Sequence, residues 1–335
     1  MTSQASKNHE PTPLYELRER ISPSTYQWIQ AEEEKEKRAL EEDKDEALQS
    51  CQLFHTIEDD DEEEEPIERV REWISSSKNV DGFGGYSTRK EQFIEKEDGA
   101  IQVKYILSDK AGGHGDDLWA ASRYIANVFA DSKKCCELIN ANECEPPLLG
   151  KSFLELGAGG GVPSWTAMKC GARVVCTDQS IPDRIRCLAE CAQRNLQDLE
   201  MEVTEENAIL ENAMQVSVCP FDWGTSPDEI ISLLGKHGEA SDVFDVILAA
   251  DCVYIPQCHD VLLMSIERLL SKDGVALLPF ALHGNTKDEN VWNIFEKAKE
   301  RGFEVEVMEK IQLTPQAIGM DERRGLVNMV RMRKI

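Results

Sequence analysis

The second half of the chain alternates short apolar runs with segments whose apolar residues recur at helical spacing. Strands are expected at 153–156, 173–177, 216–220, 243–250, 275–280, 303–308 and 326–332. Helices are expected between them at 162–169, 182–195, 228–235, 258–270 and 287–301. Such alternation predicts an α/β domain over 151–335, in which helices cover both faces of a largely parallel sheet.

Residues 67–150 form a less regular extension ahead of this domain. Its expected elements are a short helix at 67–75, strands at 86–94 and 100–107, a helix at 117–129 and a connector at 133–150. The two strands are separated by a segment that contains Asp98-Gly99, and an Asp-Gly step is a strong hairpin signal. We therefore predict an N-terminal β-hairpin and one helix in this region.

Residues 1–66 are predicted to be an acidic, largely disordered tail. Between Ala31 and Glu65 there are 17 acidic and 4 basic residues, a balance of −13 and half of the chain's net charge of −26. Residues 31–48 have high helix propensity and are expected to form a solvated helix, whereas the eight consecutive acids at 58–65 repel one another. Such a tail either keeps the protein soluble or docks on a basic protein.

The overall charge and the cysteines narrow the partners and the location. A chain with 37 basic and 63 acidic residues lacks the basic surface needed to bind nucleic acid or an anionic membrane nonspecifically. A protein with a basic surface is the better partner. The N-terminus lacks the apolar core of a signal peptide, and no apolar run is long enough to span a membrane. The eleven cysteines include no C-x-x-C pair, which favours a cytosolic or nuclear protein with neither a disulfide framework nor a metal site.

The segment from Phe153 to Ser164 carries the strongest chemical signal. A short apolar run ends at Leu156, and glycines follow at 157, 159, 160 and 161, just before an expected helix. Glycines in such a turn let backbone N–H groups approach a nucleotide-type cofactor. In a parallel sheet, ligands bind beyond the C-terminal ends of the strands, which is where this turn stands.

Three features narrow the class of cofactor. The dinucleotide motif G-x-G-x-x-G is incomplete, because Val162 occupies the third glycine position. The P-loop motif is absent from the sequence. Glu155 stands two residues before the first glycine, where its carboxylate would repel a pyrophosphate but attract a cation. S-adenosylmethionine carries a sulfonium and an ammonium and no phosphate, so it suits this site.

Further cofactor candidates follow later strands. Asp178 ends the second strand of the domain, where its carboxylate can accept hydrogen bonds from both ribose hydroxyls. After the third strand, Trp223 can lie on the adenine and Asp222 can accept a hydrogen bond from its amino group. Trp119 can close the pocket from the N-terminal side. Structural roles remain open for these residues: a helix cap for Asp178, and core packing for the two tryptophans.

The segment Asp251-Cys-Val-Tyr254, which we call the elbow, ends the fourth strand, where a transferred methyl group would emerge. Methyl transfer from a sulfonium is an in-line displacement, so aligning a neutral amine supplies most of the rate. A lysine has an ordinary pKa of about 10.4, and burial beside the sulfonium would lower it. Asp251 and Tyr254 are our catalytic candidates: they can bind and orient the amine without acting as a strong general base.

Four motifs, in this order, resemble the seven-strand methyltransferases of family 16. They are Phe153-Leu-Glu-Leu-Gly-Ala-Gly-Gly-Gly161, Thr177-Asp178, Phe221-Asp-Trp-Gly224 and Ala249-Ala-Asp-Cys-Val-Tyr254. Leu118-Trp119 also resembles the family's tryptophan segment ahead of the first motif. The resemblance covers about residues 85–335 and excludes the acidic tail.

The resemblance implies a Rossmann-like sheet of order 3-2-1-4-5-7-6 with the last strand antiparallel, and S-adenosylmethionine as cofactor. The cofactor contacts that it implies are Trp119, Gly157, Ala158, Gly159, Asp178, Trp223 and Ala250. The family is dominated by protein lysine methyltransferases, whose known substrates include elongation factors, calmodulin and chaperones. The Trp223-Gly224 pair with a short elbow is most similar to the fungal N-terminal and lysine methyltransferase of elongation factor 1-alpha.

Three functions are compatible with these observations. The first is an S-adenosylmethionine-dependent methyltransferase, expected to be a monomer, that acts on a lysine or N-terminal amine of a protein. The second is a small-molecule N-methyltransferase of the nicotinamide type, which would need a closed pocket. The third is a noncatalytic binding module, which the intact glycine turn, Asp178 and the elbow disfavour.

Overall fold

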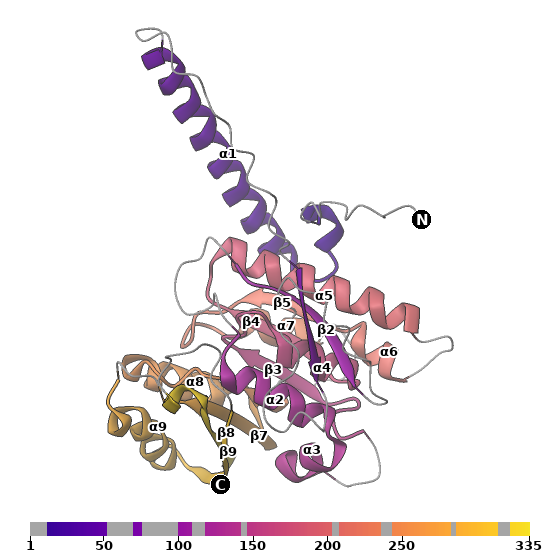
Figure 1. Ribbon diagram of the computed structural model, residues 1–335, viewed down its shortest axis with the longest axis vertical. Coiled ribbons are helices and arrows are strands. Elements are labelled where there is room, and N and C mark those ends of the chain that lie inside the picture. The colour runs from indigo at the N-terminus through magenta and orange to yellow at the C-terminus, as the bar shows by residue number, and fades with distance from the viewer. Residues whose placement is uncertain are drawn as a thin grey trace.

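A seven-stranded sheet forms the centre of the protein (Figure 1). The computed structural model describes residues 12–51, 70–75, 100–108, 118–141, 146–202, 208–235, 243–282, 286–313 and 322–335. The strands are β3 (Ser152–Leu156), β4 (Arg173–Asp178), β5 (Ser217–Pro220), β6 (Phe244–Leu248), β7 (Leu270–Ala281), β8 (Phe303–Gln312) and β9 (Leu326–Lys334). Their order is β5-β4-β3-β6-β7-β9-β8, with β9 antiparallel to both neighbours. This confirms the predicted order and the antiparallel last strand.

The register of the central strands brings the predicted motifs to one edge of the sheet. Strand β3 runs parallel to β4 on one side and to β6 on the other, so that Glu155 lies opposite both Cys176 and Leu248. The three strands therefore end together at Leu156, Asp178 and Leu248. The glycine turn follows β3 directly and lies between the ends of the two neighbouring strands.

Helices cover both faces of the sheet and bury two apolar clusters. The helices of one face are α2 (Ala120–Ala130), α3 (Ser132–Ile139), α4 (Val162–Lys169), α5 (Pro182–Glu202) and α6 (Ala208–Ala213). Those of the other face are α7 (Asp228–Gly235), α8 (His259–Leu269) and α9 (Asp288–Glu300). Short 3-10 helices lie at Pro256–Cys258 and Glu322–Gly325. Sequence periodicity predicted most of these helices, whereas α3 and α6 fall where no helix was expected.

The N-terminal region departs from the predicted tail. A 3-10 helix, Leu14–Leu17, precedes α1 (Pro23–Cys51), and α1 projects away from the sheet in Figure 1. Leu17 and Ile29 are completely buried, and Ile21 forms a parallel bridge with Val218 of β5. A largely disordered tail is therefore wrong for residues 14–29, whereas the helix expected at 31–48 lies within α1. The scattered apolar residues of this N-terminal segment find partners on α5 and at the β5 edge, which a local pattern cannot reveal.

A second departure concerns residues 70–75. We expected a short helix at 67–75, but Val70–Ser75 forms strand β1, antiparallel to β2 (Ile101–Ile106). Trp73 is buried there and donates its indole N–H to Ser75 at 3.0 Å. Pairing with a strand about 30 positions away overrides the weak local preference. The hairpin partner expected at 86–94 and the acidic run at 58–65 lie outside the described residues.

Candidate functional site

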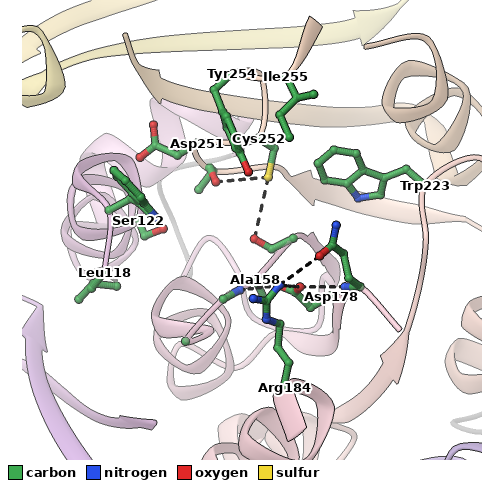
Figure 2. Close-up of a pocket in the computed structure, with 16 residues that line it drawn as sticks. Leu118, Ser122, Ala158, Asp178, Arg184, Trp223, Asp251, Cys252, Tyr254 and Ile255 are labelled. Atoms are coloured by element: carbon green, nitrogen blue, oxygen red, sulfur yellow. Dashed lines mark hydrogen bonds and ion pairs between the residues drawn. The ribbon is translucent and has the colours of Figure 1, made fainter. Parts of the chain in front are cut away.

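A cavity of about 250 Å³ lies at the C-terminal ends of β3, β4 and β6 (Figure 2). Its wall consists of Leu118, Trp119, Ser122, Gly157, Ala158, Gly159, Gly160, Asp178, Gln179, Arg184, Trp223, Ala250, Asp251, Cys252, Tyr254 and Ile255. Figure 2 shows Trp223 and Ser122 on opposite sides, with Asp178 and Arg184 together on a third. The cavity thus brings together the glycine turn, the elbow and most of the other predicted site residues.

The glycine turn forms the floor of the cavity. The backbone of Gly157 has a φ of 71°, a conformation that residues other than glycine rarely adopt. A Cβ atom at this position would lie 2.8 Å from the Sγ atom of Cys252 and 3.1 Å from the ring of Trp223. Because Gly157 has no side chain, the thiol of Cys252 and the indole of Trp223 can pack against its backbone. Ala158 and Gly159 continue the floor, as predicted from the sequence.

Asp178 lines the cavity as predicted, but its carboxylate is already engaged. Oδ2 accepts a hydrogen bond from the N–H of Gly159 at 2.7 Å, and Oδ1 accepts one from the N–H of Gln179 at 2.8 Å. Oδ1 also pairs with Arg184 Nη1 at 3.0 Å, and both side chains are almost fully buried. Asp178 therefore ties the glycine turn to the loop after β4.

The loop after β5 contributes an aromatic wall. Trp223 lines the cavity and packs against Gly157, where it can cover a planar ring. Asp222 lies elsewhere: its carboxylate is exposed and accepts hydrogen bonds from the N–H of Ser180 at 3.2 Å and from its hydroxyl at 2.7 Å. Asp222 therefore joins two loops outside the cavity wall, and the adenine contact predicted for it stays a prediction.

Glu155 is the clearest correction to the predicted site. Its side chain is completely buried behind the turn, where Oε2 accepts hydrogen bonds from the N–H of Ser164 at 3.1 Å and from the Ser164 hydroxyl. Burial raises the pKa of the Glu155 carboxyl to about 8. The group is therefore mostly uncharged at neutral pH and does not line the cavity. Side chains alternate along a strand, and this position points towards α4.

Asp251 joins three elements at the cavity. Its Oδ2 accepts a hydrogen bond from the N–H of Ala121 at 2.9 Å, and its Oδ1 accepts one from the N–H of Ala281 at 2.7 Å. Burial raises the pKa of Asp251 to about 6, although these bonds and the charge of Arg123 oppose the shift. We predicted that this carboxylate binds an ammonium. Its contacts in the structure hold the start of α2 and the end of β7, while the ammonium contact stays a prediction.

Tyr254 lies in the cavity wall, and its hydroxyl points towards the centre of the cavity in Figure 2. Burial raises the pKa of this phenol to about 12, so it stays protonated at neutral pH. The elbow that carries Tyr254 is fixed from outside by His259, whose Nε2 donates to the carbonyl oxygen of Val253 at 2.8 Å. Thr286 donates a further bond to the carbonyl of Tyr254 at 3.1 Å.

Trp119 and Ala250 also line the cavity, as expected. The sequence argument missed Arg184, Ser122 and Ile255. Arg184 follows Asp178 by six residues, in the first turn of the next helix, and Ser122 follows Trp119 by three. Helical spacing could have placed Ser122 beside Trp119, whereas Arg184 is separated from Asp178 by the loop after β4 and has no such signal.

The wall fits S-adenosylmethionine. Its charged side chains are two carboxylates, Asp178 and Asp251, and the guanidinium of Arg184. At a pH above the pKa of Asp251, these three side chains therefore have a net negative charge, which suits a cationic ligand. The ring of Trp223, packed against the turn at Gly157, offers a surface on which a planar base can lie. No cluster of potential metal ligands occurs in the part of the chain that the structure describes.

Comparison with known proteins identifies relatives. The model of the lysine methyltransferase family matches residues 101–298. The protein N-terminal and lysine N-methyltransferase EFM7 of Gibberella zeae is 29% identical over 193 residues, 56% of this chain and 66% of that protein. The efm7 protein of Aspergillus fumigatus is 30% identical over 202 residues, 59% of this chain and 68% of that protein. The chain thus spans about two thirds of the length of these two relatives.

A solved structure also matches part of this chain. A TehB-like S-adenosylmethionine-dependent methyltransferase from Corynebacterium glutamicum shares 19% identity with this chain. The match covers 66% of this chain and 90% of that one, with a TM-score of 0.38.

Proposed function

We propose a substrate for this chain, which belongs to the lysine methyltransferase family and is an S-adenosylmethionine-dependent enzyme. The proposed methyl acceptor is an amine of a protein, either a lysine side chain or the N-terminal amine. The names of the curated relatives support this acceptor class. A translation elongation factor is the first substrate to test, since the elbow and the Trp223-Gly224 pair resemble the enzyme that methylates elongation factor 1-alpha.

One observation carries the proposal: Tyr254 presents a protonated hydroxyl to the cavity at the end of β6. The cofactor of this family supplies an electrophilic methyl group. Lysine ammonium has no lone pair for attack, so the acceptor must reach the cavity as a neutral amine. The Tyr254 oxygen can accept a hydrogen bond from the amine N–H and so hold the nitrogen lone pair in line with the methyl group. Positioning of this kind supplies much of the rate in a displacement reaction.

Other residues of the cavity wall also favour a neutral amine at this position. Ser122 lies across the cavity from Trp223, one helical turn after Trp119, and offers a second hydroxyl. Removal of water by the apolar side chains of Leu118 and Ile255 would favour the uncharged amine over the ammonium. The acceptor ammonium gives its proton to solvent water before the neutral amine enters the cavity, so we assign no general base in the wall.

The charge of the chain supports a partner with a basic surface. A net charge of −26 favours encounter with a positively charged protein and disfavours nonspecific contact with nucleic acid or anionic membrane. We further propose that the enzyme is a monomer in the cytosol or nucleus. Size-exclusion chromatography with light scattering and imaging of a tagged full-length chain test these two points.

The substrate proposal is tested with tritiated S-adenosylmethionine. The full chain is incubated with extract from cells that lack it, with purified elongation factor 1-alpha and, separately, with nicotinamide. Label in one protein, mapped by mass spectrometry to a lysine or N-terminal amine, supports the proposal. Label that appears only in the small-molecule fraction contradicts it. An Asp178→Ala enzyme controls for contaminating methyltransferases, because the contacts of Asp178 with the cavity floor would be lost.

A further inference from the structure

Arg184 is a buried guanidinium in the wall of the cofactor cavity. It lies in the first turn of α5 and is 6% exposed. One of its nitrogens, Nη1, donates to Asp178 Oδ1 at 3.0 Å and to Gln179 Oε1 at 3.3 Å. The ion pair with Asp178 neutralises its charge, so the arginine can stand beside a cationic cofactor without repelling it.

The other donors of this guanidinium lack acceptors. A guanidinium has five N–H groups, and Nη1 carries only two of them. The Nε atom is fully buried and has no hydrogen-bond partner among the described residues. The Nη2 atom is not among the fully buried unpaired atoms, and the bonds from this guanidinium to described residues all start at Nη1. Leaving a buried donor unpaired is unfavourable. Nη2 is the donor that a molecule bound in the cavity can reach, and an acceptor on such a molecule would pair with it.

The carboxylate of Asp178, which pairs with Arg184, has few free acceptor sites. A carboxylate offers about four lone-pair sites, and three of those on Asp178 already accept from Gly159, Gln179 and Arg184. A ribose diol brings two O–H donors and two acceptor oxygens. About one lone-pair site of Asp178 is therefore left for the diol, so a second group beside it would help to hold both hydroxyls.

We propose that Arg184 is a cofactor-binding residue that donates a hydrogen bond to a ribose hydroxyl oxygen of S-adenosylmethionine, beside the hydroxyl bound by Asp178. Asp178 would then accept a hydrogen bond from one ribose hydroxyl, and Arg184 would donate one to the oxygen of the other. The methionine carboxylate is the alternative acceptor, and ribose analogues that lack one hydroxyl distinguish the two. This inference rests on the cofactor of the family and not on the proposed protein acceptor.

Calorimetry of the full chain tests the proposal without any methyl transfer. The probes are S-adenosylhomocysteine and its 2′-deoxy and 3′-deoxy ribose analogues. Wild-type protein is compared with Arg184→Gln, which keeps a polar side chain but loses the fork of donors. We expect Arg184→Gln to weaken binding of S-adenosylhomocysteine roughly tenfold, as for loss of one charge-assisted hydrogen bond. For one deoxy analogue, the same substitution should change the dissociation constant less than about twofold, since the accepting oxygen is already gone.

Arg194→Gln is the matched control. Arg194 stands on the same helix and pairs with Glu190 at 2.6 Å, but it does not line the cavity, so its loss should leave affinity unchanged. Equal weakening of all three ligands by Arg184→Gln would overturn the proposal, because the arginine would then act through the fold. If wild-type protein binds both deoxy analogues as tightly as S-adenosylhomocysteine, the proposal also fails, whatever the stability of the variant.

Discussion

The carboxylate of Asp251 accepts a hydrogen bond from the backbone N–H of Ala121 at 2.9 Å, across 130 positions of sequence. The bond joins the elbow after β6 to the first turn of α2, directly after Trp119. The other Asp251 oxygen holds Ala281 at the end of β7. One buried side chain therefore sets the relative positions of two walls of the cavity, and Asp251 itself has a positive φ of 52°.

Asp251→Asn should disturb this arrangement. An asparagine has one acceptor oxygen, so one of the two buried N–H groups would face an amide donor. We expect a loss of about 1–3 kcal/mol in the free energy of unfolding, with lower methyltransferase activity. Urea denaturation and initial rates measure the two effects. Asp260→Asn, which changes an exposed residue of α8, should leave both near wild type. A fully stable Asp251→Asn protein would show that these bonds contribute little.

Glu155 predicts a pH dependence of stability. Its pKa rises from 4.5 to about 8 on burial, so the folded protein binds this proton more tightly than the unfolded chain does. Stability is therefore greatest below the unfolded pKa and is lost as pH rises towards the folded value. We expect wild type to lose stability relative to Glu155→Gln between about pH 5 and 8. Urea titrations at several pH values measure the difference, and parallel curves would contradict the prediction.

Gly157→Ala should close the floor of the cavity. The added Cβ would lie 2.8 Å from Cys252 Sγ, in a backbone conformation with φ of 71°. We expect binding of S-adenosylhomocysteine to weaken at least about tenfold, measured by calorimetry. Gly302→Ala is the matched control, since its φ is 84° and a Cβ there would meet nothing within 4 Å. Similar loss of affinity in both variants would mean that backbone strain, not the cavity, is responsible.

Tyr254→Phe separates acceptor alignment from cofactor binding. The hydroxyl stays protonated at neutral pH because burial raises its pKa to about 12. Its removal should lower kcat roughly tenfold, the worth of one hydrogen bond, while the dissociation constant of S-adenosylhomocysteine stays unchanged. Single-turnover rates and calorimetry make the comparison. An unchanged kcat would remove Tyr254 from the proposed mechanism.

Leu17→Ala tests whether the N-terminal segment belongs to the folded domain. The side chain is completely buried, so its truncation should cost about 2–5 kcal/mol in the free energy of unfolding. Tyr15→Ala, at a position that is 68% exposed, should have little effect. Thermal and urea denaturation give the values. If both variants match wild type, the segment docks too weakly to contribute to stability.

Much of the fold could be predicted because its signals are local. The apolar runs of β3, β4 and β6 are long enough to mark buried strands, and their motifs occur at strand ends, where a parallel sheet gathers them. Trp119, Asp178, Trp223 and Tyr254 accordingly share one cavity. Residues 70–75 were misassigned because their partner strand supplies the stability of the extended conformation, and that partner begins at residue 101.

The sequence by itself determined the succession of strands and helices along the chain, the glycine turn and the class of cofactor, since each depends on spacing and residue type over short distances. The order of the strands within the sheet followed from the family resemblance. Only the tertiary structure decided the roles of individual polar groups. Burial turned Glu155 away from the cavity and raised its pKa, and backbone N–H groups from distant elements engaged both oxygens of Asp251. Hydrogen-bond partners and desolvation depend on which segments meet in space, and no local pattern records that.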